Sequence, residues 1–264
     1  MIPKTIHYCW FGGAPLPELA QRCIASWKKY CPDYEIKEWN ETNFDVSAMD
    51  YMREAYEEKA WGFVPDIARL QIIYEQGGIY FDTDVEAVKS FDALLENQAF
   101  MGLESGGIVA LGLGFGAEKG HPLIKLLLDD YKGRHFRNPD GSLNRMAAPA
   151  LQAPIFRKNG LSRRNKEQLV CGAAVYPTEY FCAKSCKTGV ITVTDRTYSI
   201  HHYVGSWLVD EERALQAKRN RLRLRLGRMD ILVWPFVWAA SKTRQMGFAA
   251  MVRLAAEKIR SKLA

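Results

Sequence analysis

Three acidic side chains, Asp82, Asp84 and Glu86, alternate with other residues directly after the apolar run Ile79–Phe81. That run is predicted as a short buried strand, because it is apolar and β-branched or aromatic throughout. In an extended segment residues two apart point the same way, so Asp82 and Asp84 can face one site together. Two carboxylates that close repel each other unless a cation lies beside them, and oxygen-rich sites suit Mg²⁺ or Mn²⁺. The spacing therefore predicts a divalent metal site that binds a diphosphate.

Two charged residues upstream, Asp66 and Arg69, belong to a helix predicted from Pro65 to Gln76. They are three apart and so share one face of that helix. Gly77-Gly78 ends the helix and lets the chain turn directly into the strand, which places the pair near the acids. Taken alone, Asp66 also fits a favourable position in a first helical turn, and the pair fits a surface ion pair.

The elements that must position these residues follow an α/β order. A strand is predicted over Ile2–Trp10, ending at Gly12-Gly13, followed by a helix from Pro17 to near Pro32 and a strand over Tyr34–Trp39. This order opens a doubly wound sheet, in which ligands bind at the carboxyl ends of the strands. Trp10 should therefore lie at the functional edge.

The rest of the chain is predicted from weaker patterns. Helices are expected over Ala48–Lys59 and His121–Lys132, a polar loop over Arg134–Ser142, and strands over Phe100–Leu103, Ile108–Phe115, Cys171–Pro177, Val190–Thr194 and Tyr198–Tyr203. Pro149 and Pro154 should shorten or break any helix between 144 and 161. The tail is predicted as a helix over Glu211–Arg228, an apolar run Ile231–Ala240 broken by Pro235, and a helix over Arg244–Ala264.

The charged residues of the opening stretch together form a recognisable block. Asp66, Arg69, Gly77-Gly78 and Asp82-Thr83-Asp84 resemble the Asp-Xaa-Asp sugar-binding region of glycosyltransferase family 32, which includes bacterial capsular and exopolysaccharide transferases and yeast α-mannosyltransferases. The block is also similar to the catalytic domain of the large clostridial glucosylating toxins. Two further segments, Ile6–Gly13 and His201–Trp207, resemble the first strand of the family and its C-terminal His and Ser-Trp block.

The resemblance spans roughly residues 2–210 and implies a fold as well as a site. The implied fold is α/β of the GT-A type, a doubly wound mixed sheet flanked by helices. We expect residues 1–210 to form this catalytic domain and residues 211–264 to form a basic, amphipathic helical appendage. The middle of the chain has Ala148-Pro149 where a Gly-Pro signature is expected, and Pro65 replaces a Ser often found before the helix Asp.

The family resemblance also implies a role for each matching residue. Trp10 would stack on the nucleotide base, Asp66 and Arg69 would hold the sugar, Tyr80 would line the donor site, and Asp82 would contact ribose and sugar hydroxyls.

The other end of the implied site binds the metal and the diphosphate. Asp84 would bind Mn²⁺ or Mg²⁺, and Ser206 and Trp207 would close over the diphosphate, Trp207 through its indole N–H. His201 and His202 point to opposite faces of a strand, so at most one should enter the site, and His202 is the predicted ligand.

The implied activity is a metal-dependent, retaining transfer of a hexose from a nucleotide-diphospho-sugar to a glycan. A UDP-sugar is favoured as donor over GDP-mannose, and the acceptor would be a saccharide or lipid-linked glycan in capsule, exopolysaccharide or lipopolysaccharide synthesis. Glu86 and Glu104 are the candidates for a second carboxylate, so double displacement and front-face attack both stay open.

A phosphatase of the haloacid dehalogenase type is the enzymatic alternative. It also uses Asp-Xaa-Asp after a strand, and Asp129-Asp130 resembles its later acidic motif. That superfamily expects Thr or Val where this chain has Glu86, and it gives no role to Asp66 or Arg69.

The charge of the chain is unevenly distributed. Residues 211–264 carry 13 Lys/Arg and 4 Asp/Glu, a net charge of +9, whereas residues 1–210 carry a net charge of −3. Interleaved basic and apolar residues predict docking on an anionic membrane surface, with packing on the sheet as the alternative. A non-enzymatic protein that binds nucleic acid is the other alternative. No nucleic-acid-binding module is recognisable, however, and a nucleic acid is not expected as a partner.

The expected location of the protein follows from the targeting signals that its sequence shows. No signal peptide and no span of about 20 apolar residues is visible, which predicts a cytoplasmic protein, peripheral at the inner face of the membrane. The six cysteines show no Cys-Xaa-Xaa-Cys pair, which indicates free thiols rather than zinc ligands or disulfides.

Overall fold

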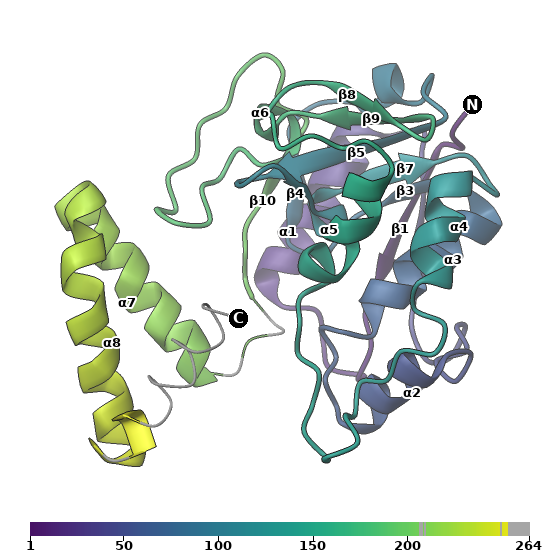
Figure 1. Ribbon diagram of the computed structural model, residues 1–264. Helices are drawn as coiled ribbons and strands as arrows, with labels where there is room; N and C mark the ends of the chain where they lie inside the picture. Colours follow the sequence, from purple (N-terminus) through teal and green to yellow (C-terminus); the bar gives the residue numbers. More distant parts are fainter. Residues whose placement is uncertain (206–207, 209, 249, 253–264) are drawn as a thin grey trace. The chain divides into compact units, whose positions relative to one another are not determined.

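The computed structural model describes residues 1–205, 208, 210–248 and 250–252 (Figure 1). The chain divides into two compact units. The first comprises Met1–Ser185 and Val190–Trp207, and the second comprises Cys186–Gly189 and Leu208–Ala264. All six cysteines lie within the described residues, and no disulfide joins them.

An eight-stranded sheet forms the centre of the first unit (Figure 1). Its strand order is β2-β1-β3-β7-β5-β9-β8, with β6 paired to β5. The strands are β1 (Thr5–Cys9), β2 (Glu35–Trp39), β3 (Gly78–Tyr80), β5 (Ala99–Glu104), β6 (Ile108–Val109), β7 (Phe115–Ala117), β8 (Gln168–Val170) and β9 (Ala173–Tyr176).

The sheet is mixed, and most of its strands end at one edge. β1 pairs in parallel with β2 and β3, and β5 pairs in parallel with β9. The antiparallel strand β7 lies between β3 and β5, so β3 and β5 run in the same direction. The carboxyl ends of these five strands therefore share one edge, and the predicted α/β fold with a mixed sheet is confirmed.

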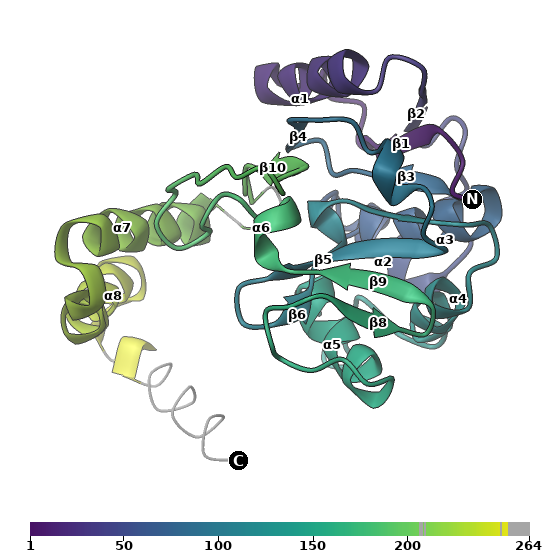
Figure 2. The same cartoon turned by 90° about the horizontal axis from the view of Figure 1, so that it is seen from above.

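Side chains alternate between two hydrophobic cores, one on each face of the sheet. In β3 and the next residue, Ile79 and Phe81 belong to one core and Tyr80 to the other. Helix α1 and the short α6 pack on the first face, and helices α2 to α5 pack on the second (Figure 2). The helices are α1 (Glu18–Tyr30), α2 (Asp50–Glu57), α3 (Pro65–Gln76), α4 (Pro122–Asp129) and α5 (Ala148–Lys158), with the short α6 (Thr178–Phe181) after β9.

A second, two-stranded sheet joins segments far apart in the sequence. β4 (Val85–Ala87) pairs antiparallel with β10 (Ser199–His201), with His201 opposite Val85. The backbone N–H of His202 donates to the carbonyl of Asp84 at 2.9 Å. This pairing brings the end of β10 to the acidic segment that follows β3.

Proline and glycine account for most departures from the predicted elements. α5 is an 11-residue helix despite Pro149 and Pro154. Pro149 lies in the first turn, where a missing N–H costs nothing, and Pro154 removes a single hydrogen bond from a helix whose Phe156 is fully buried. The strand predicted over 108–115 is instead divided into β6 and β7 by a 3₁₀ turn, η2 (Leu111–Leu113), and Gly114 takes a φ of +111°.

Two other predicted segments also differ. The stretch 190–194 is not a strand, since only an isolated bridge joins Ile191 to Lys184. In the second unit, α7 (Asp210–Leu226) and α8 (Asp230–Met246) are joined by a 3₁₀ turn, η3 (Gly227–Met229). The predicted break at Pro235 is wrong, because α8 continues through it.

The far end of the tail is described only in part. The predicted range of the last helix, Arg244–Ala264, lies in large part outside the described residues, which end at residue 252. Among the helices that the structure describes, none has both the length and the hydrophobicity needed to cross a membrane.

Candidate active site

The polar side chains predicted for chemistry meet at the carboxyl edge of the sheet. Phe81 continues β3, its backbone N–H donating to the carbonyl of His7 at 3.0 Å. Because Tyr80 faces the side of α3 and Phe81 faces away, alternation directs Asp82 toward α3. The helix begins at Pro65 and carries Asp66 in its first turn.

Arg69 connects the helix to the strand end. Its Nη2 forms an ion pair with Oδ1 of Asp66, and its Nη1 lies 3.4 Å from Oδ1 of Asp82. The guanidinium also lies over the Tyr80 ring, 5.6 Å from its centroid. Asp66 and Arg69 are only 6% and 5% exposed, which excludes the surface ion pair considered from the sequence. The two carboxylates compensate a buried cation and fix its direction.

Gly112 in η2 is a part of this cluster that the sequence did not indicate. A Cβ at this position would lie 2.3 Å from Oδ2 of Asp82 and 3.3 Å from Nη1 of Arg69. The absence of a side chain therefore lets the turn cover the Asp82 carboxylate. A glycine in a glycine-rich run is the only sequence signal, and it does not reveal which carboxylate lies opposite.

Asp84 and His201 form the second half of the cluster. His201 Nε2 lies 3.2 Å from Oδ1 of Asp84, and the backbone N–H of Val204 donates to Oδ2 of Asp84 at 2.9 Å. One ligand atom from each of Asp82, Asp84 and His201 lies within 4.8 Å of the others. Two carboxylates and an imidazole at this spacing can bind one divalent cation.

The surroundings of Asp82 and Asp84 shift the pKa values of the two carboxyl groups in opposite directions. Burial raises the pKa of Asp82, and the neighbouring Asp84 adds to this effect against the opposing charge of Arg69. Burial alone would raise the pKa of Asp84 as well, but His201 and the N–H of Val204 outweigh it and hold that pKa at about 2. Burial lowers the pKa of His201, but the neighbouring acids Asp84, Asp82 and Glu104 together raise it above its ordinary value. Asp84 is therefore the permanently ionised member of the cluster.

The structure places the two adjacent histidines against different carboxylates. His202, the predicted metal ligand, places its Nε2 2.8 Å from Oε2 of Glu86, away from the acid pair. His201 approaches Asp84 because the β4–β10 register sets it opposite Val85 and adjacent to Asp84. The prediction that a single histidine of the pair enters the cluster agrees with this geometry, but the residue that enters is His201.

The remaining predicted residues lie at the border of the cluster or outside the described chain. Trp10 follows β1, packs against the core on the α1 face, and donates its indole N–H to the carbonyl of Ala14 at 2.5 Å. Its role with a base stays a prediction. Ser206 and Trp207 lie outside the described residues.

The acidic residues invoked for a phosphatase are engaged elsewhere. Asp129, at the end of α4, forms ion pairs with Lys125 and Lys132 at 2.5 and 2.7 Å. Asp130 accepts from Arg134 at 2.8 Å. Each acid is thus held by basic residues of its own helix end, which leaves the phosphatase alternative without its second acidic motif.

Comparison with known proteins assigns the segment that carries these residues. Residues 17–101 match the family model described as "Glycosyltransferase sugar-binding region containing DXD motif". The match confirms the resemblance found in the sequence, and it includes Asp66, Arg69, Asp82 and Asp84. His201 and Gly112, which complete the geometry around the DXD acids, lie beyond the matched segment.

Two yeast proteins are similar to part of this chain. Inositol phosphoceramide mannosyltransferase 3 of Schizosaccharomyces pombe is 32% identical over 132 residues, covering 47% of this chain and 35% of the relative. Inositol phosphoceramide mannosyltransferase 1 of the same organism is 30% identical over 115 residues, covering 38% and 33%. The chain thus spans about a third of the length of each relative.

Two solved structures also align with the chain. PaToxG glycosyltransferase aligns with a TM-score of 0.42 and 20% identity, covering 48% of this chain and 59% of its own. A glycosyltransferase involved in the glycosylation of the major capsid of PBCV-1 aligns with a TM-score of 0.41 and 10% identity, covering 82% and 97%.

Proposed function

We propose that the protein is a metal-dependent glycosyltransferase that moves a hexose from a nucleotide-diphospho-sugar to a glycan acceptor. The observation that carries this proposal is the convergence of Asp82, Asp84 and His201 within 4.8 Å, next to the buried Asp66–Arg69 pair of the DXD region. A cation site beside a fixed, charged arginine suits a diphosphate joined to a polyhydroxylated sugar.

The donor atoms of the cluster fit a divalent metal. Asp84 and His201 would hold the ion with Asp82 beside them, and the N–H of Val204 would orient the Asp84 carboxylate. Carboxylates suit Mg²⁺ and Mn²⁺, and the imidazole shifts the preference toward Mn²⁺. When bound, the ion would neutralise charge on the departing diphosphate.

The chain's own residues would orient the sugar for transfer. Arg69, fixed by Asp66 and Asp82, would donate to sugar hydroxyls, and free acceptor oxygens of Asp66 and Asp82 would receive hydrogen bonds from others. The bond from the anomeric carbon to the phosphate oxygen breaks, and the nucleoside diphosphate leaves with the electron pair. The acceptor oxygen bonds to the anomeric carbon, and its proton passes to the departing phosphate or to water.

Retention of anomeric configuration is part of the proposal, because the resemblance to glycosyltransferase family 32 implies it. Glu86 is hydrogen-bonded to His202 and is 37% exposed in its side chain, so it would need to leave this partner to act as a nucleophile. Glu104 ends β5 at the same edge of the sheet. Front-face attack and double displacement both remain as hypotheses.

The donor and the acceptor follow from weaker signals. A UDP-hexose is the favoured donor, and GDP-mannose gains support from the two yeast relatives, which are named as mannosyltransferases. Those relatives are named for a phosphate-containing lipid acceptor, which supports a lipid-linked glycan over a free saccharide. We place the reaction in the cytoplasm, in capsule, exopolysaccharide or lipopolysaccharide synthesis.

A panel of sugar nucleotides with Mn²⁺ tests the proposal, scored by donor hydrolysis and by protection against thermal unfolding. At least one nucleotide sugar should be hydrolysed and should raise the unfolding temperature only when the metal is present. Asp84→Ala and His201→Ala should abolish both effects. Metal-dependent hydrolysis that survives in Asp84→Ala would refute the site.

The adjacent histidine supplies the matched control. His202→Ala removes a hydrogen bond to Glu86 but lies outside the cation cluster. Its rate of metal-dependent donor hydrolysis should therefore stay within about threefold of the parent's, and the nucleotide sugar should still raise its unfolding temperature when the metal is present. If His202→Ala lost protection and His201→Ala kept it, the sequence-based choice of His202 would be right.

A further inference from the structure

The second unit contains two helices, α7 and α8, whose described side chains are all at least partly exposed. None of the side chains of α7 and α8 that the structure describes is buried, although each helix has 17 residues. The two helices contact each other through Arg219, whose guanidinium lies 5.0 Å from the centre of the Trp234 ring. Helices gain most of their stability by burying an apolar face, so this pair needs a further surface.

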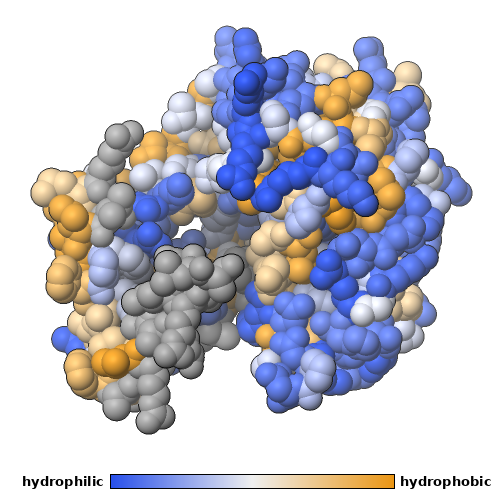
Figure 3. Space-filling view, in the orientation of Figure 1, coloured by the Kyte–Doolittle hydropathy of each residue, from blue (hydrophilic) through white to orange (hydrophobic). Residues whose placement is uncertain are grey.

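The outward face of α8 is apolar. Leu232 and Phe236 are four residues apart and so share one face, and they are 69% and 76% exposed. Met229 and Val233 are also exposed on this face, one turn earlier and beside Leu232. Trp234 lies on the other side of α8, toward α7. Figure 3 shows hydrophobic side chains along α8, at the left edge of the view.

Exposed basic side chains, mainly on the neighbouring helix α7, form what we call the basic rim of the tail. Residues 218–228 contain six Lys/Arg and no Asp/Glu. Lys218, Arg221 and Arg225 of α7 are exposed, as is Arg244 near the end of α8. Acidic residues of α7 are confined to its first turn, at Asp210, Glu211 and Glu212. The tail therefore combines an apolar face with a basic rim.

We propose that α7 and α8 form a docking surface for the headgroup region of an anionic lipid bilayer, with Leu232 and Phe236 inserted between acyl chains. A helical segment that lies in the interface combines an apolar face a few residues wide with cationic side chains; here the apolar face lies on α8 and the exposed cationic side chains lie mainly on α7. The basic rim attracts anionic headgroups, and the exposed Phe236 of the apolar face can insert below them. α8 lies on the membrane and does not cross it.

Two other occupants fit the charges and side chains less well. A second copy of this chain would bring two tails of net charge +9 together, and like charges repel. A nucleic acid would neutralise the basic rim but leave Leu232 and Phe236 in water, because it offers no apolar surface to cover them. This inference does not depend on the proposed sugar transfer.

Vesicle sedimentation with the full chain tests the surface. We expect binding to vesicles of phosphatidylcholine with phosphatidylglycerol, weak binding to phosphatidylcholine alone, and release at high salt. The double variant Leu232→Asp/Phe236→Asp should bind the anionic vesicles about tenfold or more weakly, because it places two charges in the apolar face. Unchanged binding of this variant would overturn the proposal, and so would equal binding to both kinds of vesicle.

Matched controls separate docking from other effects. Leu169 of β8, in the first unit, is 76% exposed, so Leu169→Asp adds a charge at an equally exposed apolar position and should leave binding unchanged. Far-ultraviolet circular dichroism checks that the double variant keeps its helices. Sedimentation equilibrium without lipid measures the oligomeric state of the parent and of the double variant. A parent that is a dimer and a double variant that is a monomer would assign the face to a second copy of the chain and refute lipid docking.

Discussion

At the scale of single residues, the site depends on one arginine shared by two acids. Arg69 is almost fully buried and pairs with Asp66 from its own helix and with Asp82 from the strand end. Because both carboxylates balance its charge, the Arg69 guanidinium is a hydrogen-bond donor with a fixed direction. Removal of either acid would leave part of the buried positive charge of Arg69 without compensation. The position of the Asp82 carboxylate thus depends on everything that touches it, including the backbone of Gly112.

Gly112→Ala should disturb the cluster without changing any charge. The added methyl would lie 2.3 Å from Oδ2 of Asp82, so the carboxylate must move. We expect a loss of about 10–100-fold in Mn²⁺ affinity and donor hydrolysis, the usual effect of disturbing the groups that orient a metal site. Isothermal titration of Mn²⁺ and a hydrolysis assay measure the two losses.

Gly116→Ala is the control for simple crowding. Its Cβ would lie 2.6 Å from the Phe100 ring, in the core and away from the acids. It should lower the unfolding temperature and leave Mn²⁺ affinity unchanged. Equal losses of affinity in both variants would mean that Gly112 acts through stability alone.

The sequence predicted the residues of this site better than their exact partners. Asp66 and Arg69 could be placed near Asp82 because helical spacing and the Gly77-Gly78 turn are local. The choice between His201 and His202 could not be made locally, since it depends on the register of β10 against β4, which lies more than 100 residues earlier. Gly112 was missed for the same reason.

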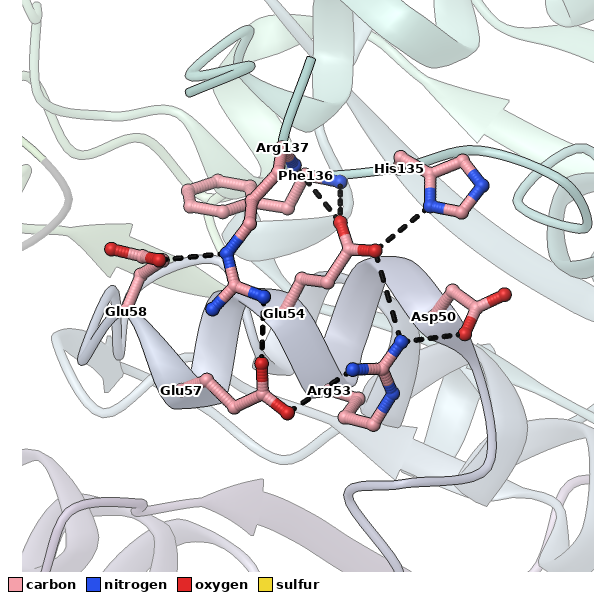
Figure 4. A network of polar contacts seen from close by, with 8 residues as sticks. All are labelled: Asp50, Arg53, Glu54, Glu57, Glu58, His135, Phe136 and Arg137. Atoms are coloured by element: carbon pink, nitrogen blue, oxygen red, sulfur yellow. Dashed lines mark hydrogen bonds and ion pairs between the residues drawn. The ribbon is translucent and has the colours of Figure 1, made fainter. Parts of the chain in front are cut away.

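At the scale of elements, a buried glutamate fixes the loop after α4 to helix α2 (Figure 4). Oε2 of Glu54 accepts the backbone N–H groups of Phe136 and Arg137, each at 2.9 Å, and Oε1 lies 2.8 Å from Nδ1 of His135. Burial opposes ionisation of Glu54, but these N–H donors and His135 outweigh it and lower its pKa. The carboxylate replaces the hydrogen bonds that the irregular loop backbone lacks.

The anchoring of this loop should depend on pH. Because the folded-state pKa of Glu54 lies below its ordinary value of 4.5, its stabilisation is complete above that value and is lost as pH falls through the folded-state pKa. Glu54→Gln keeps the shape but replaces charged hydrogen bonds by neutral ones, which costs about 1–2 kcal/mol of local protection. Hydrogen exchange at Phe136 and Arg137 should show this loss near neutral pH and its disappearance in acid.

His135 provides the opposite pH signature. The hydrogen bond and charge of Glu54 raise the pKa of His135, so its contribution is complete below 6.5 and is lost as pH rises through its folded-state pKa. The hydrogen-exchange protection of Phe136 and Arg137 in His135→Ala should therefore equal that of the parent at alkaline pH and be lower than that of the parent at mildly acidic pH. If Glu54→Gln exchanged like the parent near neutral pH, the loop would be held by other contacts.

Elements were predictable where local periodicity sets them and less so where packing does. α3 was predicted at its observed bounds because Pro65 and Gly77 mark its ends. α8 was not, because a proline removes one helical hydrogen bond and the sequence does not show whether the helix ends there or continues, as it does at Pro235. The short strand β4 has no sequence signal of its own beyond Val85, and it exists because β10 pairs with it.

At the scale of the whole molecule, the buried apolar side chains belong almost entirely to one unit. Both hydrophobic cores are built from residues between Ile2 and Phe181, and among the described residues Met251 is the only buried apolar side chain that follows Ile200. The first unit therefore contains the apolar burial that stabilises a fold of this size. The charge pattern agrees with this division, because the tail carries the excess of Lys and Arg.

Truncation after Asp210 should consequently separate catalysis from docking. Residues 1–210 keep both cores and the Asp82–Asp84–His201 cluster, so the fragment should fold and hydrolyse the donor with Mn²⁺ like the full chain. Its unfolding temperature should lie within about 2–4 °C of the parent, which corresponds to less than about 1 kcal/mol. Binding to anionic vesicles should disappear, as in Leu232→Asp/Phe236→Asp. A fragment that aggregates or unfolds would instead show that the tail packs on the sheet as part of the fold, and a fragment that still binds the vesicles would place the membrane contact in the first unit.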